Sequence, residues 1–337
     1  MYPEEMNVAK SDKILLRALS SNSRTSLAEL SRQVGMSPAT TNKLLKHMVS
    51  HLGVKFTLEV DLDKLGFSER HILSVRFGKK PDELFLSELF AGDPFTQDAF
   101  ITNGGFDLLL FVAADTPMNY MKWETDIAVK LSKYLPEFRP SEYIFDMLGF
   151  MPLNDSFVDF IKEGIKADAT DRALLRILNG NSRASYREMG NELGVNEDTV
   201  RYRVFKLQRS GIIRRFTVAV QNSGGVLSSY FMRYRFDERT MSDIFPKQRR
   251  HNVGEDDALP LVNRTPMLVL LSGSYRFFGL SFGYTRKQSI DSGVKWHANL
   301  LKGNNPHEAH AVITKSVKGL LPLRNLDAER NYRYIWR

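Results

Sequence analysis

The chain contains an internal repeat, and this repeat limits the architectures that it can adopt. When the sequence is shifted by 159 positions, residues 12–47 align with residues 171–206, and twelve of the 36 aligned positions are identical. Identical pairs include Arg24/Arg183 and Gly35/Gly194. A repeat of this spacing in a chain of 337 residues indicates the duplication of one module of about 160 residues.

Each copy opens with a pattern that predicts three short helices. Leucines at helical spacing form one apolar stripe in each copy, at 15–19 and at 174–178. The second helix of each copy begins with a Ser-x-x-Glu sequence, which predicts a capping box. A glycine then ends that helix, and the third helix begins at a capping serine or asparagine. The residues that carry these signals are Ser26, Glu29, Gly35 and Ser37 in the first copy, and Ser185, Glu188, Gly194 and Asn196 in the second.

A β-ribbon follows the third helix in the second copy, where Gly211 leads into the β-forming run 212–220. Three helices, a tight glycine turn and a β-wing predict a winged helix-turn-helix in each copy. The alternative is an ordinary three-helix packing unit that binds nothing.

The third helix has a distinctive outer face. In the second copy, Val200, Val204 and Leu207 fall on one side at 100° per residue, and Tyr202 and Arg209 point away from it. In the first copy, the inward set is Thr41, Leu45 and Met48. An exposed face of aromatic and basic side chains suits a DNA major groove, although such a face is often only a solvated surface. The predicted DNA-binding residues are Thr40, Lys43, Lys46 and His47 in the first copy, and Thr199, Arg201, Tyr202, Arg203, Lys206, Arg209, Arg214 and Arg215 in the second.

The remainder of each copy predicts a second kind of domain. Strand and helix patterns between residues 71 and 148 follow the order βαββαβ, which is that of a ferredoxin-like plait. The same order occurs between residues 230 and 317, with helices expected at 239–249 and 286–301. The second fit is weaker, because Pro246 interrupts one helix and a polar insertion follows at 252–257.

A winged helix-turn-helix whose wing reads GIIRRFTVAV, followed by a βαββαβ domain, resembles the Lrp/AsnC (feast/famine) transcription regulators. NEDTVRYRVFKLQRSGIIRR is similar to the segment from recognition helix to wing in that family. The resemblance implies DNA-dependent transcriptional control, assembly through the plaits, and a small ligand such as an amino acid between plaits. TNGGFDLLL at 102–110 resembles the turn and strand of the family's effector site, which implies effector-binding roles for Asn103, Gly104, Gly105 and Asp107.

Several positions depart from the family pattern. In the first recognition helix Leu44 stands where the second has Arg203, and Thr41 replaces Val200. In the second plait the matching turn reads SGSYRFFGL, with Arg276 in place of Asp107. The second ligand turn is therefore expected to be altered or lost.

The predicted fold class is α+β, with two winged helix-turn-helix domains alternating with two ferredoxin-like plaits. We expect a first winged domain over 1–62 and a first plait over 63–153. A linker helix and the second winged domain are expected over 154–223, and a second plait over 224–337. Apolar residues at helical spacing between 154 and 169 predict the linker helix.

Net charge differs between these units. Residues 10–60 hold 8 Lys/Arg against 3 acids, and residues 170–222 hold 10 against 5, so both heads carry +5. Residues 61–150 hold 9 against 15, or −6, whereas residues 223–337 hold 18 against 10, or +8. Opposite charge favours pairing of the first plait with the second, as an intrachain pseudo-dimer or a homodimer of fused chains. The alternative is that these charges lie on outer helical faces.

Other function classes find little support in the sequence. No apolar run of about 18 residues predicts a membrane span, the N-terminus lacks a signal-peptide pattern, and the chain has no cysteine, so a cytoplasmic protein is expected. No catalytic or cofactor motif occurs, and the His307–His310 segment lacks the HExxH spacing of a metal site. Two alternatives remain. One is a sirohaem decarboxylase-like enzyme on the same fold, although the His-Asn-Tyr-x-Arg-type run of that family is absent. The other is a protein-interaction module that has lost DNA binding.

Overall fold

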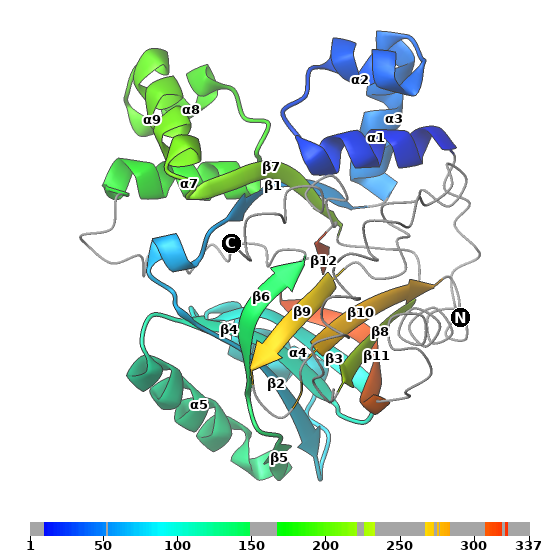
Figure 1. The fold of residues 1–337 in the computed structure, drawn as a ribbon, viewed down its shortest axis with the longest axis vertical. Coiled ribbons are helices and arrows are strands. Elements are labelled where there is room, and N and C mark those ends of the chain that lie inside the picture. Colours follow the sequence, from blue (N-terminus) through cyan, green and yellow to red (C-terminus); the bar gives the residue numbers. More distant parts are fainter. Residues whose placement is uncertain are drawn as a thin grey trace, which may run out of the picture.

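The computed structural model describes residues 10–51, 53–148, 167–220, 226–232, 267–272, 275, 277–283, 307–318 and 321–322. Two helical heads lie side by side at one end of the molecule, and a β-rich body lies below them (Figure 1). Helices and antiparallel strands are mixed along the chain, so the α+β class is confirmed.

The first head consists of α1 (Lys10–Ser21), α2 (Leu27–Val34), α3 (Pro38–His51) and the wing strand β1 (Val54–Val60). Ser26 caps α2, and Gly35 ends it with a φ of 72°, a left-handed conformation that favours glycine. The expected capping box is only half formed. Ser26 accepts from the Glu29 amide, but the Glu29 carboxylate binds the side chains of Arg32 and Gln33. Arg32 and Gln33 lie about one helical turn from Glu29, and their side chains take the carboxylate in place of the Ser26 backbone N–H.

The second head consists of α7 (Ala169–Gly180), α8 (Tyr186–Leu193), α9 (Glu197–Arg209) and the wing strand β7 (Ile213–Val220). Its capping box is complete, because the Ser185 and Glu188 side chains each bind the backbone N–H of the other residue. Gly194 ends α8 with a φ of 68°, and the Asn196 side chain caps α9. The signals for the three helices are therefore confirmed in both heads.

The two wings form one antiparallel ladder. Strand β1 pairs with β7 in a register that runs from Val54↔Val220 through Thr57↔Thr217 to Val60↔Ile213. A short third strand, β12 (Leu321–Pro322), pairs with the other edge of β7. The wings therefore join the heads to each other, which the sequence alone did not indicate.

The first half of the body has the expected plait order. After a 3-10 turn, η1 (Asp63–Leu65), the elements are β2 (Glu69–Phe77), α4 (Glu83–Ala91), β3 (Thr96–Gly104), β4 (Leu108–Ala114), α5 (Pro117–Leu131) and β6 (Glu142–Leu148). A second 3-10 turn, η2 (Ser132–Tyr134), and a short strand, β5 (Pro136–Phe138), lie between α5 and β6 and were not predicted. Strand order β3-β4-β2-β6 is that of a ferredoxin-like plait.

The second half contributes β8 (Val226–Met232), β9 (Met267–Ser272), β10 (Phe277–Gly283) and β11 (His307–Lys318). Their spatial order, β11-β8-β10-β9, repeats the order of the first half strand for strand. The helices predicted at 239–249 and 286–301, and the linker segment 154–166, lie outside the described residues.

The two halves pair through their edge strands. β3 of the first half pairs with β11 of the second, and β6 pairs with β9, both antiparallel. Because β4 also pairs with β2, eight strands form a closed ring, and β5 extends from it beside β2. The expected pairing of first half with second half is thus observed within one chain.

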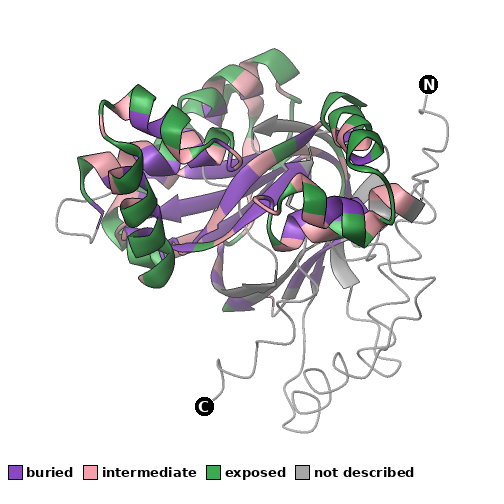
Figure 2. Ribbon diagram, turned by 90° about the horizontal axis from the view of Figure 1, so that it is seen from above, coloured by how far each residue is buried: buried purple, intermediate pink, exposed green. Residues whose placement is uncertain are grey.

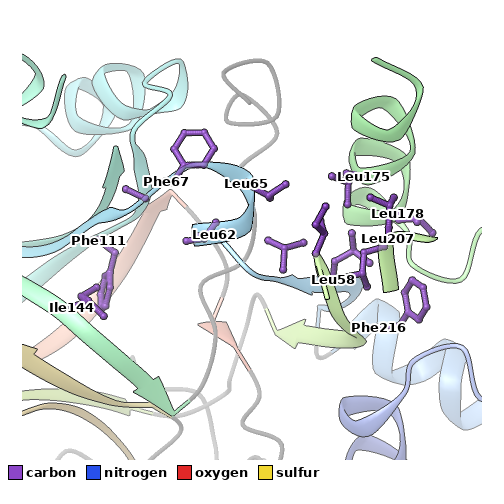
Figure 3. Packing of buried hydrophobic residues seen from close by; sticks show 14 of the residues in the cluster. Leu58, Leu62, Leu65, Phe67, Phe111, Ile144, Leu175, Leu178, Leu207 and Phe216 are labelled. Atoms are coloured by element: carbon purple, nitrogen blue, oxygen red, sulfur yellow. The ribbon is translucent and has the colours of Figure 1, made fainter. Parts of the chain in front are cut away.

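The apolar core is continuous from the second head into the body. One cluster contains Leu175 and Leu207 of the second head, Leu62 and Leu65 near the end of the first wing, and Phe111 of the body (Figure 3). The first head has a separate cluster, which meets the rest of the molecule through Val54 and Val218 of the wing ladder. The two heads are therefore attached to the body in different ways.

Candidate nucleic-acid interface

Helix α9 presents a wide side-chain face to solvent. Val200, Val204 and Leu207 are fully buried, as the helical spacing predicts. Tyr202 and Phe205 on the other side are 68% and 59% exposed. Two large aromatic rings therefore lie on the solvent-facing side of α9. Exposed residues cover the outer sides of both heads (Figure 2).

The first turn of α9 contains an internal charge network. Exposed Arg201 pairs with Glu197 at 2.9 Å and with Asp198 at 3.3 Å, and its guanidinium lies over the Tyr186 ring. Thr199 donates its backbone N–H to the capping Asn196 side chain at 2.6 Å. The two carboxylates also stabilise the helix N-terminus.

Arg203 and Lys206 bind carboxylates of their own head. The Asp171 side chain, which is fully buried, receives Arg203 Nη1 at 2.9 Å and Lys206 Nζ at 3.2 Å. Arg203 Nη1 also lies 2.7 Å from Asp168 Oδ2. The hydrogen bond from Arg203 lowers the pKa of Asp168, and the two carboxylates raise the pKa of Arg203. Arg203 therefore ties α9 to α7, whereas Lys206 and the exposed Arg209 remain at the surface.

The wing arginines cross to the neighbouring wing. Arg214 Nη2 lies 3.0 Å from Asp61 Oδ2, and Arg215 pairs with Glu59 and donates to Ser20 O at 3.1 Å. The sequence predicted that Arg214 and Arg215 contact DNA. The fold gives them carboxylate partners 153 and 156 residues away.

The first head presents the expected outward set. Thr40, Lys43, Lys46 and His47 are exposed on α3, while Thr41 and Met48 are buried and Leu45 is partly buried. The His47 ring stacks on the His51 ring with centroids 4.1 Å apart.

The heads contact each other through equivalent residues of the repeat. Ser23 Oγ and Ser182 Oγ lie 2.6 Å apart. Arg24 donates to Ser182 O at 2.7 Å and to Ala184 O at 2.9 Å, and Arg183 donates reciprocally to the carbonyls of Ser23 and Thr25. Burial and the neighbouring Arg24 charge lower the pKa of Arg183. Arg24 and Arg183 occupy equivalent positions in the repeat alignment, so the sequence shows that they are related. That each donates to carbonyls of the opposite head is seen only in the fold.

One lysine joins the second head to the first half of the body. Lys64 Nζ donates to Ser210 O, just after the last residue of α9, at 2.8 Å. A cation at this end of a helix satisfies a free carbonyl and stabilises the helix dipole. The repeat-equivalent position is Ser223, so the repeat does not supply the same lysine to the first head.

The predicted effector residues lie where the two halves of the body meet. Asn103 is exposed and pairs in register with Val312 of β11, and Gly104 has a φ of 145°. Asp107 Oδ2 accepts the Phe77 N–H at 3.0 Å, and Asp107 Oδ1 lies 3.2 Å from Lys80 Nζ. Gly105 O accepts from Arg139 Nη2 at 2.9 Å.

The corresponding turn of the second half is only partly described. The backbone N–H of Tyr275 donates to the buried carboxylate of Glu142 at 3.2 Å. Arg276 lies outside the described residues.

Two negative findings apply to the described part of the chain. It contains no group of three or more His, Asp or Glu side chains placed to hold a metal ion. It also contains no helix that is long and apolar enough to cross a bilayer.

Two three-helix heads with capped turns, outward third helices and paired wings define a winged helix-turn-helix protein. Residues 168–208 match the AsnC-type helix-turn-helix domain, and residues 9–50 match a winged helix-turn-helix DNA-binding family. The helix-turn-helix segment of the second head is thus of the AsnC type.

Archaeal regulators are among the similar proteins. The chain is 53% identical over 53 residues to the HTH-type transcriptional regulator Ptr1 of Methanocaldococcus jannaschii. This alignment covers 16% of this chain and 36% of that protein. It is 32% identical over 114 residues to an uncharacterised HTH-type transcriptional regulator of Pyrococcus abyssi. This alignment covers 34% of this chain and 66% of that protein. The aligned part is thus less than two thirds of either relative.

Two solved structures of one protein are similar over almost the whole chain. The sirohaem decarboxylase NirDL in complex with an iron-uroporphyrin III analogue superimposes with a TM-score of 0.57 and 11% identity, covering 96% of this chain and 97% of that one. At this identity the likeness shows a shared fold only.

Proposed function

We propose that this chain is a sequence-specific, double-stranded DNA-binding transcription regulator of the Lrp/AsnC type. The observation that carries the proposal is the pair of helices α3 and α9. Each belongs to a capped helix-turn-helix and presents its polar face to solvent. The regulators similar to its helix-turn-helix segments support the same function.

The contacts between the heads favour one mode of DNA binding. Ser23 faces Ser182, Arg24 and Arg183 exchange contacts, and Thr57 pairs with Thr217 in an antiparallel ladder. These three relationships share one approximate two-fold axis, and both heads lie at the same end of the molecule (Figure 1). A protein with two-fold related heads reads two inverted half-sites. We therefore assign both half-sites of one operator to a single chain.

The outward side chains differ between the heads, so the half-sites should differ too. On α9 we assign direct DNA contact to Tyr202, Lys206 and Arg209, with Thr199 and Arg201 at the entering end of the helix. Arg203, Arg214 and Arg215 are assigned supporting roles, because each is held by a carboxylate of another element. Lys206 also pairs with Asp171 of α7, but it stays in the contacting set because it lies one turn from both Tyr202 and Arg209 on the exposed face of α9. On α3 the corresponding set is Thr40, Lys43, Lys46 and His47.

DNase I footprinting on the chain's own upstream region tests the proposal. We expect protection of two inverted, non-identical half-sites by a chain that is monomeric at the same concentration. Affinity should fall steeply as salt increases, because phosphate neutralisation releases counterions. A chain that binds no duplex at low salt would instead favour the protein-interaction module.

The domain organisation belongs to the same proposal. We infer winged domains over 1–62 and 154–223 and plaits over 63–153 and 224–337, so that one chain provides what two single-module subunits provide elsewhere. The repeated strand order and the β3–β11 and β6–β9 pairings support this organisation.

A small ligand such as an amino acid is proposed to bind at Asn103, Gly104, Gly105 and Asp107. The exposed turn at the junction of the two halves supports this placement. Isothermal titration with single amino acids tests it. Asp107→Asn should weaken binding, whereas binding that is unchanged in this variant would place the ligand elsewhere.

A second candidate function is that of a sirohaem decarboxylase-like enzyme, because a protein with that activity shares this fold over almost the whole chain. Decarboxylation of propionates on a tetrapyrrole would use this same body. No histidine occurs in the segment 96–112, which carries the first turn and its flanking strands. Incubation of the chain with sirohaem under reducing conditions separates the two functions, since only the enzyme would release carbon dioxide.

A further inference from the structure

The last two turns of α3 carry a pair of exposed histidines, His47 and His51. Their ring centroids lie 4.1 Å apart, and the ring planes differ by 28°. Residues four apart lie on one face of a helix, so both imidazoles are presented to solvent side by side. The repeat-equivalent residues of the second head are Lys206 and Ser210, so this pair belongs to the first head alone.

Ser50 fixes the tautomer of His51. The Ser50 hydroxyl donates its proton to the carbonyl of Lys46 at 3.0 Å or of His47 at 3.2 Å. The same oxygen lies 2.8 Å from His51 Nδ1, and His47 O lies 3.3 Å from that nitrogen. When the hydroxyl proton goes to a carbonyl, both oxygens accept from Nδ1, so this network assigns the ring proton to Nδ1. This network leaves the lone pair on Nε2, the arrangement typical of a metal-binding histidine.

We propose that His47 and His51 chelate a divalent transition-metal ion, such as Zn²⁺, on the outer face of the first head. In the stacked arrangement the nitrogen lone pairs lie in nearly parallel ring planes, so binding turns the exposed His47 ring out of the stack until both Nε2 atoms face one ion. Two histidines in His-x-x-x-His spacing bring two ligands to one side of a helix. Neutral imidazole suits zinc, copper and nickel. His51 is also the last residue of α3, where the negative end of the helix dipole favours a cation.

The rest of the coordination shell comes from water. The described residues provide no third His, Asp or Glu for this ion. Lys43 and Lys46 are exposed on the same helix, and their charges weaken cation binding. The site is therefore open and exchangeable, unlike a structural zinc site, which has four protein ligands.

Occupancy would change the charge of the first head. A bound dication adds positive charge to the face where the proposed function places DNA phosphates. This consequence depends on the proposed function, but metal binding itself does not. The test therefore measures metal binding without DNA.

The experiment is a Zn²⁺ titration of the full chain in chelator-free buffer at about pH 7.5. Isothermal titration should detect a site that His47→Gln and His51→Gln each weaken by about tenfold or more, the scale of effect seen when a metal site loses support. Lys46→Gln, an exposed neighbour on α3, is the matched control and should not weaken the site.

Two further measurements keep the result clear. The variants should unfold at the same temperature as the wild type without metal, because both side chains are exposed. Added Zn²⁺ should raise the melting temperature of the wild type more than that of the double variant, because a ligand stabilises the state that it binds. His307→Gln with His310→Gln should leave the site intact. Unchanged Zn²⁺ affinity in the double variant His47→Gln/His51→Gln would overturn the proposal. So would an affinity that one of the two single variants lowers and the other leaves unchanged.

Discussion

Ser23 and Ser182 share a hydrogen bond of 2.6 Å although 159 residues separate them. That separation equals the offset of the sequence repeat, so the two hydroxyls occupy equivalent positions and meet on the approximate two-fold axis between the heads. Two residues that the sequence relates only by similarity are thus in direct contact in the structure.

The reciprocal arginines on this axis should stabilise the paired heads. Arg24→Ala removes two donated bonds to carbonyls of the second head, and Arg183→Ala removes their counterparts. Hydrogen bonds from charged donors contribute about 1.5–3 kcal/mol, so each variant should lower the free energy of unfolding by about 2 kcal/mol. Urea unfolding measures this. Arg32→Ala, which loses only a local exposed ion pair, should cost less than about 0.5 kcal/mol. Equal losses in all three variants would show that the heads are not coupled in this way.

The buried carboxylate of Asp171 should contribute more to the stability of the second head than the carboxylate of Asp168. Asp171 is fully buried and binds both Arg203 and Lys206, whereas the Asp168 side chain is about half exposed. Breaking a buried ion pair costs about 3–5 kcal/mol, so Asp171→Asn should strongly destabilise the second head. Asp168→Asn should cost much less. Thermal unfolding followed by circular dichroism compares the two, and a similar cost would mean that burial is not what matters here.

Leu65 should connect the second head to the body. It is fully buried in the cluster that extends from α7 and α9 to β4 (Figure 3). Leu65→Ala should lower stability by about 2–5 kcal/mol, because it leaves a cavity in that core. Leu84→Ala on α4, where the side chain is 66% exposed, should change stability by less than about 0.5 kcal/mol. Chemical denaturation distinguishes them, and a small effect at Leu65 would imply that the second head folds independently of the body.

Mild acid should destabilise the body through His71. Burial lowers the pKa of His71, which stacks on Tyr120 with ring centroids 3.8 Å apart and contacts Glu69. Below its ordinary pKa of 6.5 the unfolded chain therefore binds a proton that the folded chain resists, and stability falls as pH decreases. The slope is at most about 1.4 kcal/mol per pH unit for one proton.

His71→Phe tests this effect, because phenylalanine keeps the ring stack and cannot titrate. Free energies of unfolding measured between pH 7 and pH 5 should depend less on pH in this variant than in the wild type. The exposed His47→Gln variant serves as the control and should retain the wild-type slope. An unchanged slope in His71→Phe would assign the acid sensitivity to other groups.

The second head should dominate DNA affinity. Lys206→Ala with Arg209→Ala should weaken operator binding more than Lys43→Ala with Lys46→Ala, because α9 adds aromatic contacts that α3 lacks. Tyr202→Ala, which removes a ring that is 68% exposed, should weaken binding without lowering stability. Gel-shift titrations at fixed salt measure these effects. Equal losses from the two lysine-containing pairs would show that the heads contribute equally.

The sequence predicted the local elements of this chain well. Caps at Ser26, Ser185 and Asn196 and left-handed glycines at 35 and 194 marked the helix ends. The buried stripe of α9 followed from the 3.6-residue period, because side-chain direction within one helix depends only on spacing. The order of strands in both halves of the body was also predicted. Strand β5 was not predicted, and the helices expected in the second half lie outside the described residues.

Only the tertiary structure decided which charges face solvent. Arg203 and Lys206 find Asp171 at separations of 32 and 35 residues, and Arg214 and Arg215 find acids of the other wing more than 150 residues away. Helical spacing shows which side of a helix a residue occupies, but a partner so distant in sequence is brought near only when the chain closes on itself. The same reason applies to the β1–β7 ladder and the closed ring of strands. The sequence by itself determined what the modules are, and long-range packing decided how they join and which cations remain free to meet a ligand.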